Sequence, residues 1–130
     1  MNINWKYVTP VSKEQIAEVE KTFNIIVPDE LKAVIKVGNN GVPSKRFFDT
    51  DFSKEHELKT LLSYDKRDIE NIFSAFAVIR KENENLIPIA NDPAGNLICL
   101  DNGNVVFWKH ETNEMETIAS SITDFFDKLY

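Results

Sequence analysis

Residues 86–108 read LIPIANDPAGNLICLDNGNVVFW, and this stretch decides the fold. Two continuously apolar runs, 97–100 and 105–108, stand on either side of Asn102-Gly103. Asn-Gly is the preferred sequence of a two-residue type I′ hairpin loop, because both residues tolerate the positive φ that this loop requires. The pattern therefore predicts two antiparallel strands joined by a tight turn.

Neighbouring runs extend this hairpin into a meander. Leu86 to Ala90 is a third apolar run, and the β-turn composition of Asp92 to Gly95 connects it to the hairpin. Within the run, Pro88 favours a sheet edge or a strand end, since proline cannot donate to a strand ladder. A short strand over 114–118 is expected on the other side of the hairpin.

The N-terminal part of the chain predicts two helices. Ser12 and Gln15 form a capping-box sequence at the start of a helix over 13–23. A second helix is expected between Pro28, which suits the first helical position, and Gly38, a common C-terminal stop.

Two further helices are expected later in the chain. Apolar residues recur at helical spacing after Asp68, and again after Ser120, which is a candidate N-cap. These apolar positions are Ile69, Ile72, Phe73 and Phe76 in the third helix, and Ile122, Phe125, Phe126 and Leu129 in the fourth.

Weaker signals fill 44–66, where strands are expected at 47–48 and 57–62. An apolar strand edge near 58–62 would let two copies pair, so the chain is expected to be a monomer or a weak homodimer. Helices and strands segregate along the chain without regular alternation, which is typical of the α+β class. We therefore predict a single domain over 1–130, in which about four helices flank a mainly antiparallel sheet.

Charge is distributed unevenly along the chain. The net charge is −6, and residues 91–130 contribute −5 of it through seven Asp or Glu and two Lys. This sign argues against nucleic acid or an anionic membrane as a partner and is compatible with a basic protein such as a nuclease. A solvated surface that keeps the protein soluble explains it equally well. The candidate partner-binding residues are Asp92, Asp101, Glu111, Glu114 and Glu116.

Signals for export or membrane insertion are missing from the sequence. Met1 to Lys6 lacks the basic and apolar segments of a signal peptide, and no apolar run approaches the roughly 20 residues that span a bilayer. The single cysteine, Cys99, lies in an apolar run and is expected to be a buried structural thiol. These features indicate a cytoplasmic protein with no membrane association.

Residue patterns for catalysis are also missing. His56 and His110 are the two histidines, and neither belongs to a metal-ligand motif, so structural or surface roles are expected for both. Neither a nucleophile elbow nor a phosphate-binding glycine motif occurs in the sequence. We therefore expect no cofactor and no enzymatic activity.

Four segments, taken in order, are similar to the sequence pattern of one protein family. The first, 25–30, places an apolar run and a proline before two acids, and the second, 39–43, is similar to Asn-Gly-Gly-x-Pro with Asn40 in place of the first glycine. The third is 86–92 running into 95–101, and the fourth is 105–111 followed by 118–122 and Phe125-Phe126. Scaffold positions within them are Pro28, Asn39, Gly41, Pro88, Gly95 and Trp108. The pattern resembles the SUKH superfamily of bacterial immunity proteins, whose relatives include a fungal cell-wall synthesis regulator.

The resemblance implies an α+β fold and a binding function. A SUKH immunity protein binds a cognate toxin, often a nuclease or a nucleic-acid deaminase, and so protects the cell that produces it. A regulatory adaptor that binds a housekeeping partner is the alternative interpretation. An enzyme would require a deep pocket that holds His110 with two or more carboxylates.

Overall fold

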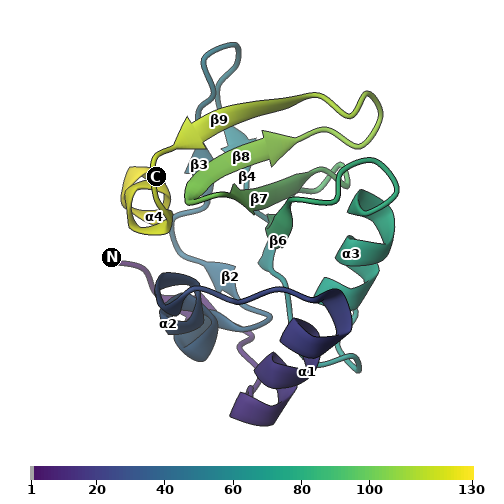
Figure 1. The fold of residues 1–130 in the computed structure, drawn as a ribbon. Helices are drawn as coiled ribbons and strands as arrows, with labels where there is room; N and C mark the ends of the chain where they lie inside the picture. The colour runs from purple at the N-terminus through teal and green to yellow at the C-terminus, as the bar shows by residue number, and fades with distance from the viewer. Residues whose placement is uncertain (1) are drawn as a thin grey trace.

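A five-stranded antiparallel sheet forms the centre of the protein. The computed structural model describes residues 2–130 and is drawn as a ribbon in Figure 1. The strands lie in the order β5-β6-β7-β8-β9. Their bounds are Thr60–Leu61 for β5, Ile87–Asn91 for β6, Leu97–Asp101 for β7, Asn104–Trp108 for β8 and Met115–Ala119 for β9. The predicted meander is therefore confirmed.

Four helices and two short strand pairs surround this sheet. The helices are α1 (Lys13–Phe23), α2 (Asp29–Gly38), α3 (Ile72–Ile79) and α4 (Ile122–Lys128). One strand pair joins β1 (Trp5–Lys6) to β2 (Val42–Pro43), and the other joins β3 (Phe47–Phe48) to β4 (His56–Glu57). α3 packs on β6, whereas α4 packs on β8 and β9 (Figure 1). The predicted α+β class with four helices is confirmed.

The β7–β8 hairpin closes as the sequence predicts. Asp101 pairs with Asn104, which leaves a two-residue loop with φ of 48° at Asn102 and 93° at Gly103. Positive φ at both loop residues is the signature of the type I′ turn. In β6, the pairing register shifts after Pro88, so the proline lies at a bulge near the start of its strand.

Two helix starts differ by one residue from the sequence expectation. Pro28 is the N-cap of α2 and not its first helical residue. Ser121, and not Ser120, caps α4, because its hydroxyl accepts a hydrogen bond from the amide of Asp124 at 3.0 Å. Two adjacent serines have the same capping chemistry, and the sequence alone does not show which hydroxyl reaches the helix.

The third helix starts at Ile72 and not directly after Asp68 as predicted. The side chain of Asn71 accepts a hydrogen bond from the first turn and caps α3, which begins at Ile72. Upstream, the carboxylate of Asp65 accepts from both the amide and the guanidinium of Arg67, and these contacts lower its pKa. This turn competes with the helix, so Ile69 lies outside it and is 92% exposed.

The stretch 57–62 forms two short strands and not one open edge. The amide of Leu61 donates to the carbonyl of Gly41 at 2.9 Å, and the amide of Leu58 donates to the carbonyl of Arg46 at 2.7 Å. Both leucine side chains are buried. The chain itself closes this side of the sheet, so 58–62 does not offer the open edge that the sequence suggested for pairing two copies.

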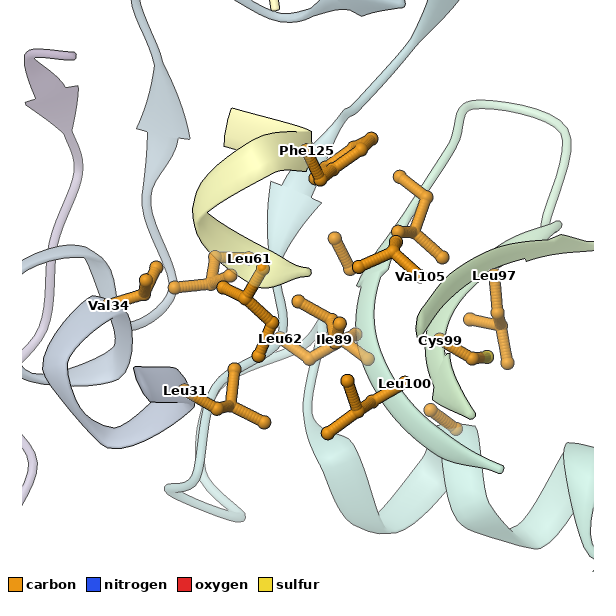
Figure 2. Close-up of a cluster of buried hydrophobic side chains, with 14 of the residues drawn as sticks. Leu31, Val34, Leu61, Leu62, Ile89, Leu97, Cys99, Leu100, Val105 and Phe125 are labelled. Atoms are coloured by element: carbon orange, nitrogen blue, oxygen red, sulfur yellow. The ribbon is translucent and has the colours of Figure 1, made fainter. Parts of the chain in front are cut away.

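Both faces of the sheet are buried along β6, β7 and β8. Successive residues of a strand point to opposite faces, yet Phe107 and Trp108 are each 1% exposed. Figure 2 shows side chains that fill the space between the sheet, α2 and α4, among them Leu31, Leu61 and Phe125. Cover on both sides explains why these strands are continuously apolar instead of alternating.

A buried amide ties three segments of the chain together. Asn39 Nδ2 donates to Ser63 Oγ at 3.2 Å and to the carbonyl of Thr9 at 3.3 Å, while Asn39 Oδ1 accepts from the amide of Tyr64 at 2.9 Å. Asp68 accepts from the hydroxyls of Ser63 at 2.6 Å and Thr9 at 2.7 Å. This scaffold position therefore needs a side chain with a donor and an acceptor on one planar group.

Close packing against Trp5 accounts for Gly38 and Gly41. A Cβ on Gly38 would lie 2.7 Å from Cδ2 of the Trp5 ring, and a Cβ on Gly41 would lie 2.7 Å from the carbonyl oxygen of Gly38. Of the residues in this turn, Asn40 has the positive φ, at 64°. Gly38 therefore lets the indole approach the end of α2 and does not itself adopt a left-handed conformation.

We expect Gly38→Ala to destabilise the fold by about 1–3 kcal/mol, because the new methyl overlaps the Trp5 ring. In a Trp5→Ala background the same substitution should stabilise the fold by roughly 1 kcal/mol, since the higher helix propensity of alanine then acts alone. Urea unfolding of the wild type, both single variants and the double variant measures the two effects. An equal cost in both backgrounds would show that Trp5 is not the obstacle.

We expect Asn39→Asp to lower the free energy of unfolding by on the order of 3 kcal/mol, because it replaces the buried donor with an acceptor and buries a charge. Asn102→Asp is the matched control, since it makes the same chemical change at an exposed hairpin loop. The control should change the unfolding free energy by less than about 0.5 kcal/mol. Similar losses in the two variants would contradict the role given to Asn39.

Candidate partner-binding surface

The five candidate acids do not lie together. Asp92 is 7% exposed, and its carboxylate accepts hydrogen bonds from the amides of Ala94 at 2.9 Å and Asn96 at 2.7 Å. It thereby holds the turn between β6 and β7, in which Gly95 has a φ of 87°. Asp101 is the last residue of β7, beside the β7–β8 turn and at the other end of the strand from Asp92. The Asp92 turn contacts the β8–β9 loop through His110, but its carboxylate is buried and committed to that turn, whereas Asp101 lies away from the remaining three candidates.

The remaining three candidates share the hairpin formed by β8 and β9. Glu111 and Glu114 are exposed in the loop between the two strands, and Glu116 is half-buried in β9 opposite Phe107. Lys109 is the one Lys or Arg between residues 104 and 119. This hairpin therefore carries a concentrated negative charge.

The loop between β3 and β4 lies beside this hairpin. The amide of Asp51 donates to Glu116 Oε1 at 3.1 Å, although 65 positions separate the two residues in sequence. At the base of the loop, Asp49 Oδ1 accepts from the hydroxyl of Tyr130 at 2.6 Å and from the amide of Glu55 at 3.0 Å. These two hydrogen bonds lower the pKa of the Asp49 carboxyl, which stays ionised at neutral pH and anchors the loop.

We refer to the loop 49–55 and residues 108–116 together as the hairpin surface. It contains a hollow of about 300 Å³ lined by Phe52, Phe107, Lys109, Glu114, Met115 and Glu116. Phe52 is 87% exposed and Met115 is 48% exposed. Six carboxylates and two lysines belong to this surface. Apolar side chains within a polar rim are the usual anatomy of a protein–protein interface.

Both histidines have structural partners near this surface. The His56 ring stacks on Phe48 with 5.5 Å between ring centroids and lies 4.9 Å from the ring of Phe107. His110 Nε2 lies 2.9 Å from the carbonyl oxygen of Ala94. The first histidine joins the β3–β4 pair to the sheet, and the second joins two turns. These positions agree with the structural or surface roles expected for both.

The remaining reactive groups are held apart or buried. Within residues 2–130, no group of three or more His, Cys, Asp or Glu side chains is placed to hold a metal ion. Cys99 is fully buried, and burial raises the pKa of its thiol, which keeps it protonated.

No helix within residues 2–130 has the length and apolar character needed to cross a membrane.

Sequence reasoning named the three glutamates that 108–116 contributes to the hairpin surface, but neither the acids nor the aromatic side chain of the loop 49–55. Phe52 lies in the polar stretch 49–55 between two strands that gave weak signals. A single aromatic residue in a polar loop is the sequence signal that could have identified it. Its proximity to Met115 depends on the contact between Asp51 and Glu116, which no local pattern predicts.

Comparison with known proteins shows the family. The SMI1 / KNR4 family (SUKH-1) model matches residues 10–128. The crystal structure of a protein from Pseudomonas syringae pv. tomato has the same fold, with a TM-score of 0.63 at 16% sequence identity over 95% of this chain and 84% of that chain. A search of the curated proteins found no match. Because the family match spans nearly the whole sequence, the chain belongs to the SMI1 / KNR4 family (SUKH-1).

Proposed function

We propose that this SUKH domain is an immunity protein that binds a cognate toxin through the hairpin surface and blocks it. The observation that carries the proposal is Phe52, which is 87% exposed on an anchored loop, beside Met115 and within an acidic rim. Fully burying a phenylalanine side chain stabilises a complex by roughly 2–3 kcal/mol. Family membership supports a binding role, because SUKH domains act broadly in immunity and regulation.

In this mechanism the protein covers the toxin and performs no chemistry on it. Nucleases and nucleic-acid deaminases bind an anionic substrate, so their substrate grooves are basic. The six carboxylates of the hairpin surface outnumber its two lysines and attract such a groove over a distance. An interface of ordinary size buries about 800 Å² on each partner, enough to occlude a substrate groove. The protein acts in the cytoplasm of the producing cell and needs no cofactor.

Co-expression with the product of the neighbouring reading frame tests the function. We expect the neighbour to stop growth when expressed alone, and this protein both to restore growth and to co-purify with it. Phe52→Ala should weaken the complex about 30-fold, which corresponds to about 2 kcal/mol. Ile69→Ala is the matched control, because Ile69 is 92% exposed in another part of the fold and should not affect binding. A harmless neighbour, or one that does not bind this protein, would rule out the proposal.

A charge-reversal pair tests the acidic rim separately. Glu111→Lys with Glu114→Lys should slow association by about tenfold at low salt and weaken its dependence on salt concentration. The control pair is Asp101→Lys with Glu84→Lys, which changes the net charge equally at exposed or half-buried positions outside the hairpin surface. Stopped-flow association rates over a salt series distinguish the two pairs. Equal rates for both pairs would show that the total charge of the protein, and not the rim, attracts the toxin.

A further inference from the structure

The outer edge of β9 is an open strand edge. β9 is the last strand of the sheet, with β8 as its one neighbour among residues 2–130. In an antiparallel ladder, pairs that exchange backbone hydrogen bonds alternate with pairs whose N–H and C=O groups point away from each other. The amide of Lys109 donates to the carbonyl of Glu114 at 2.8 Å, so these two residues form a bonded pair. The register is regular from this pair as far as Val106–Thr117, so Trp108–Met115 and Val106–Thr117 are pairs that exchange no bonds. The backbone groups of Met115 and Thr117 therefore point outward.

No other part of the described structure covers these outward groups. Residues 2–130 provide no hydrogen bond to the outer backbone of Met115 or Thr117, and both residues are exposed. β9 contains neither proline nor lysine, which commonly protect an edge strand from pairing. By contrast, Gly41 closes the β5 side of the sheet through its bond to Leu61. Of the two edges of the main sheet, β9 is the one left available for pairing.

The hollow of the hairpin surface lies beside this edge. Glu114, Met115 and Glu116 line it on the β9 side, and Phe52 lines it from the loop 49–55. Figure 1 shows this loop projecting past β9 at the top of the view. A strand paired with β9 would direct every second side chain to the face that carries Glu116, and so into the hollow.

The chemistry of the hollow favours a long cationic side chain. Glu114 and Glu116 offer carboxylates to an ammonium or a guanidinium group, and the Phe52 ring offers a cation–π contact. The apolar rings of Phe52 and Phe107, which also line the hollow, suit the methylene stem of arginine or lysine. A second copy of the chain is the poorer occupant, because two paired β9 strands would bring like-charged glutamates together.

We infer that β9 accepts an extended, basic segment of the partner as a sixth strand of the sheet. This inference rests on the proposed function, since it specifies how the toxin contacts the hairpin surface. Met115 and Thr117 each present one donor and one acceptor to the incoming backbone, and the hollow receives an arginine or lysine side chain. Main-chain pairing supplies affinity in this mode, and the alternate side chains supply specificity.

The test uses the purified protein and a defined peptide. An acetylated and amidated octapeptide of alternating arginine and valine is titrated into ¹⁵N-labelled protein. We expect the amide signals of Met115 and Thr117 to shift and their hydrogen exchange to slow. With free peptide at ten times its dissociation constant, one chain in about eleven is unbound, so exchange should slow about elevenfold. The same peptide methylated on alternate backbone nitrogens keeps its charge but cannot pair, and should not protect these amides.

A pair of variants tests whether the peptide binds at the outer edge of β9. Thr117→Pro removes an outward amide without removing a bond to β8, and should weaken peptide binding at least about tenfold. Thr117→Val keeps the amide and a β-branched side chain, and should bind as the wild type does. Circular dichroism confirms that each variant is folded. If Thr117→Pro does not fold, the methylated peptide still tests the pairing.

Three results would overturn the inference: equal binding of the methylated peptide, signal shifts centred away from β9, or no binding at millimolar peptide. Dimerisation through β9, seen by sedimentation and abolished by Thr117→Pro, would assign the edge to a second copy and would also overturn it. None of these measurements involves the neighbouring reading frame. A failed peptide titration therefore leaves the immunity proposal to its own co-expression test, and a harmless neighbour leaves the peptide result standing.

Discussion

Burial of the inner strands of the central sheet on both faces is the constraint on which the rest of the structure depends. Phe107 and Trp108 follow one another in β8, point to opposite faces and are each 1% exposed. Several elements provide this cover. α3 packs on β6, and α4 packs on β8 and β9. The β3–β4 pair packs on β8 through the rings of Phe48 and Phe107. A sheet covered in this way meets other proteins through its edge, its turns and the loops beside it. The candidate surface consists of these three kinds of structure.

Contacts between distant segments anchor that surface to the rest of the fold. The backbone of Tyr130 pairs with Phe47 at 2.9 and 3.0 Å, and its hydroxyl holds Asp49 at the base of the exposed loop. The bond from Asp51 to Glu116 then fixes the loop against β9. A loop that is ordered in the free protein loses less conformational entropy on binding, so a single exposed aromatic ring can contribute more of its burial to affinity.

Features set by a few adjacent residues could be predicted from the sequence. The Asn102-Gly103 loop and the capping box of α1 are of this kind, and both are confirmed. Helical spacing from Ile69 onward gave a wrong helix start, because an upstream turn and a cap at Asn71 compete with it and periodicity does not register them. The candidate site could be predicted only in part for a related reason. Charge counts identify acids, but they do not show that Asp92 is committed to its own turn, or that Phe52 meets β9.

The position of Cys99 determines how the protein can be labelled with thiol-reactive dyes. It is the one cysteine of the chain, lies fully buried in the middle of β7, and has a thiol whose pKa is raised by burial. The folded protein is therefore nearly inert toward thiol-reactive dyes. A second cysteine introduced on an exposed loop would carry a fluorophore selectively, with the natural thiol left in place. Slow labelling of Cys99 itself would then measure how often the sheet opens.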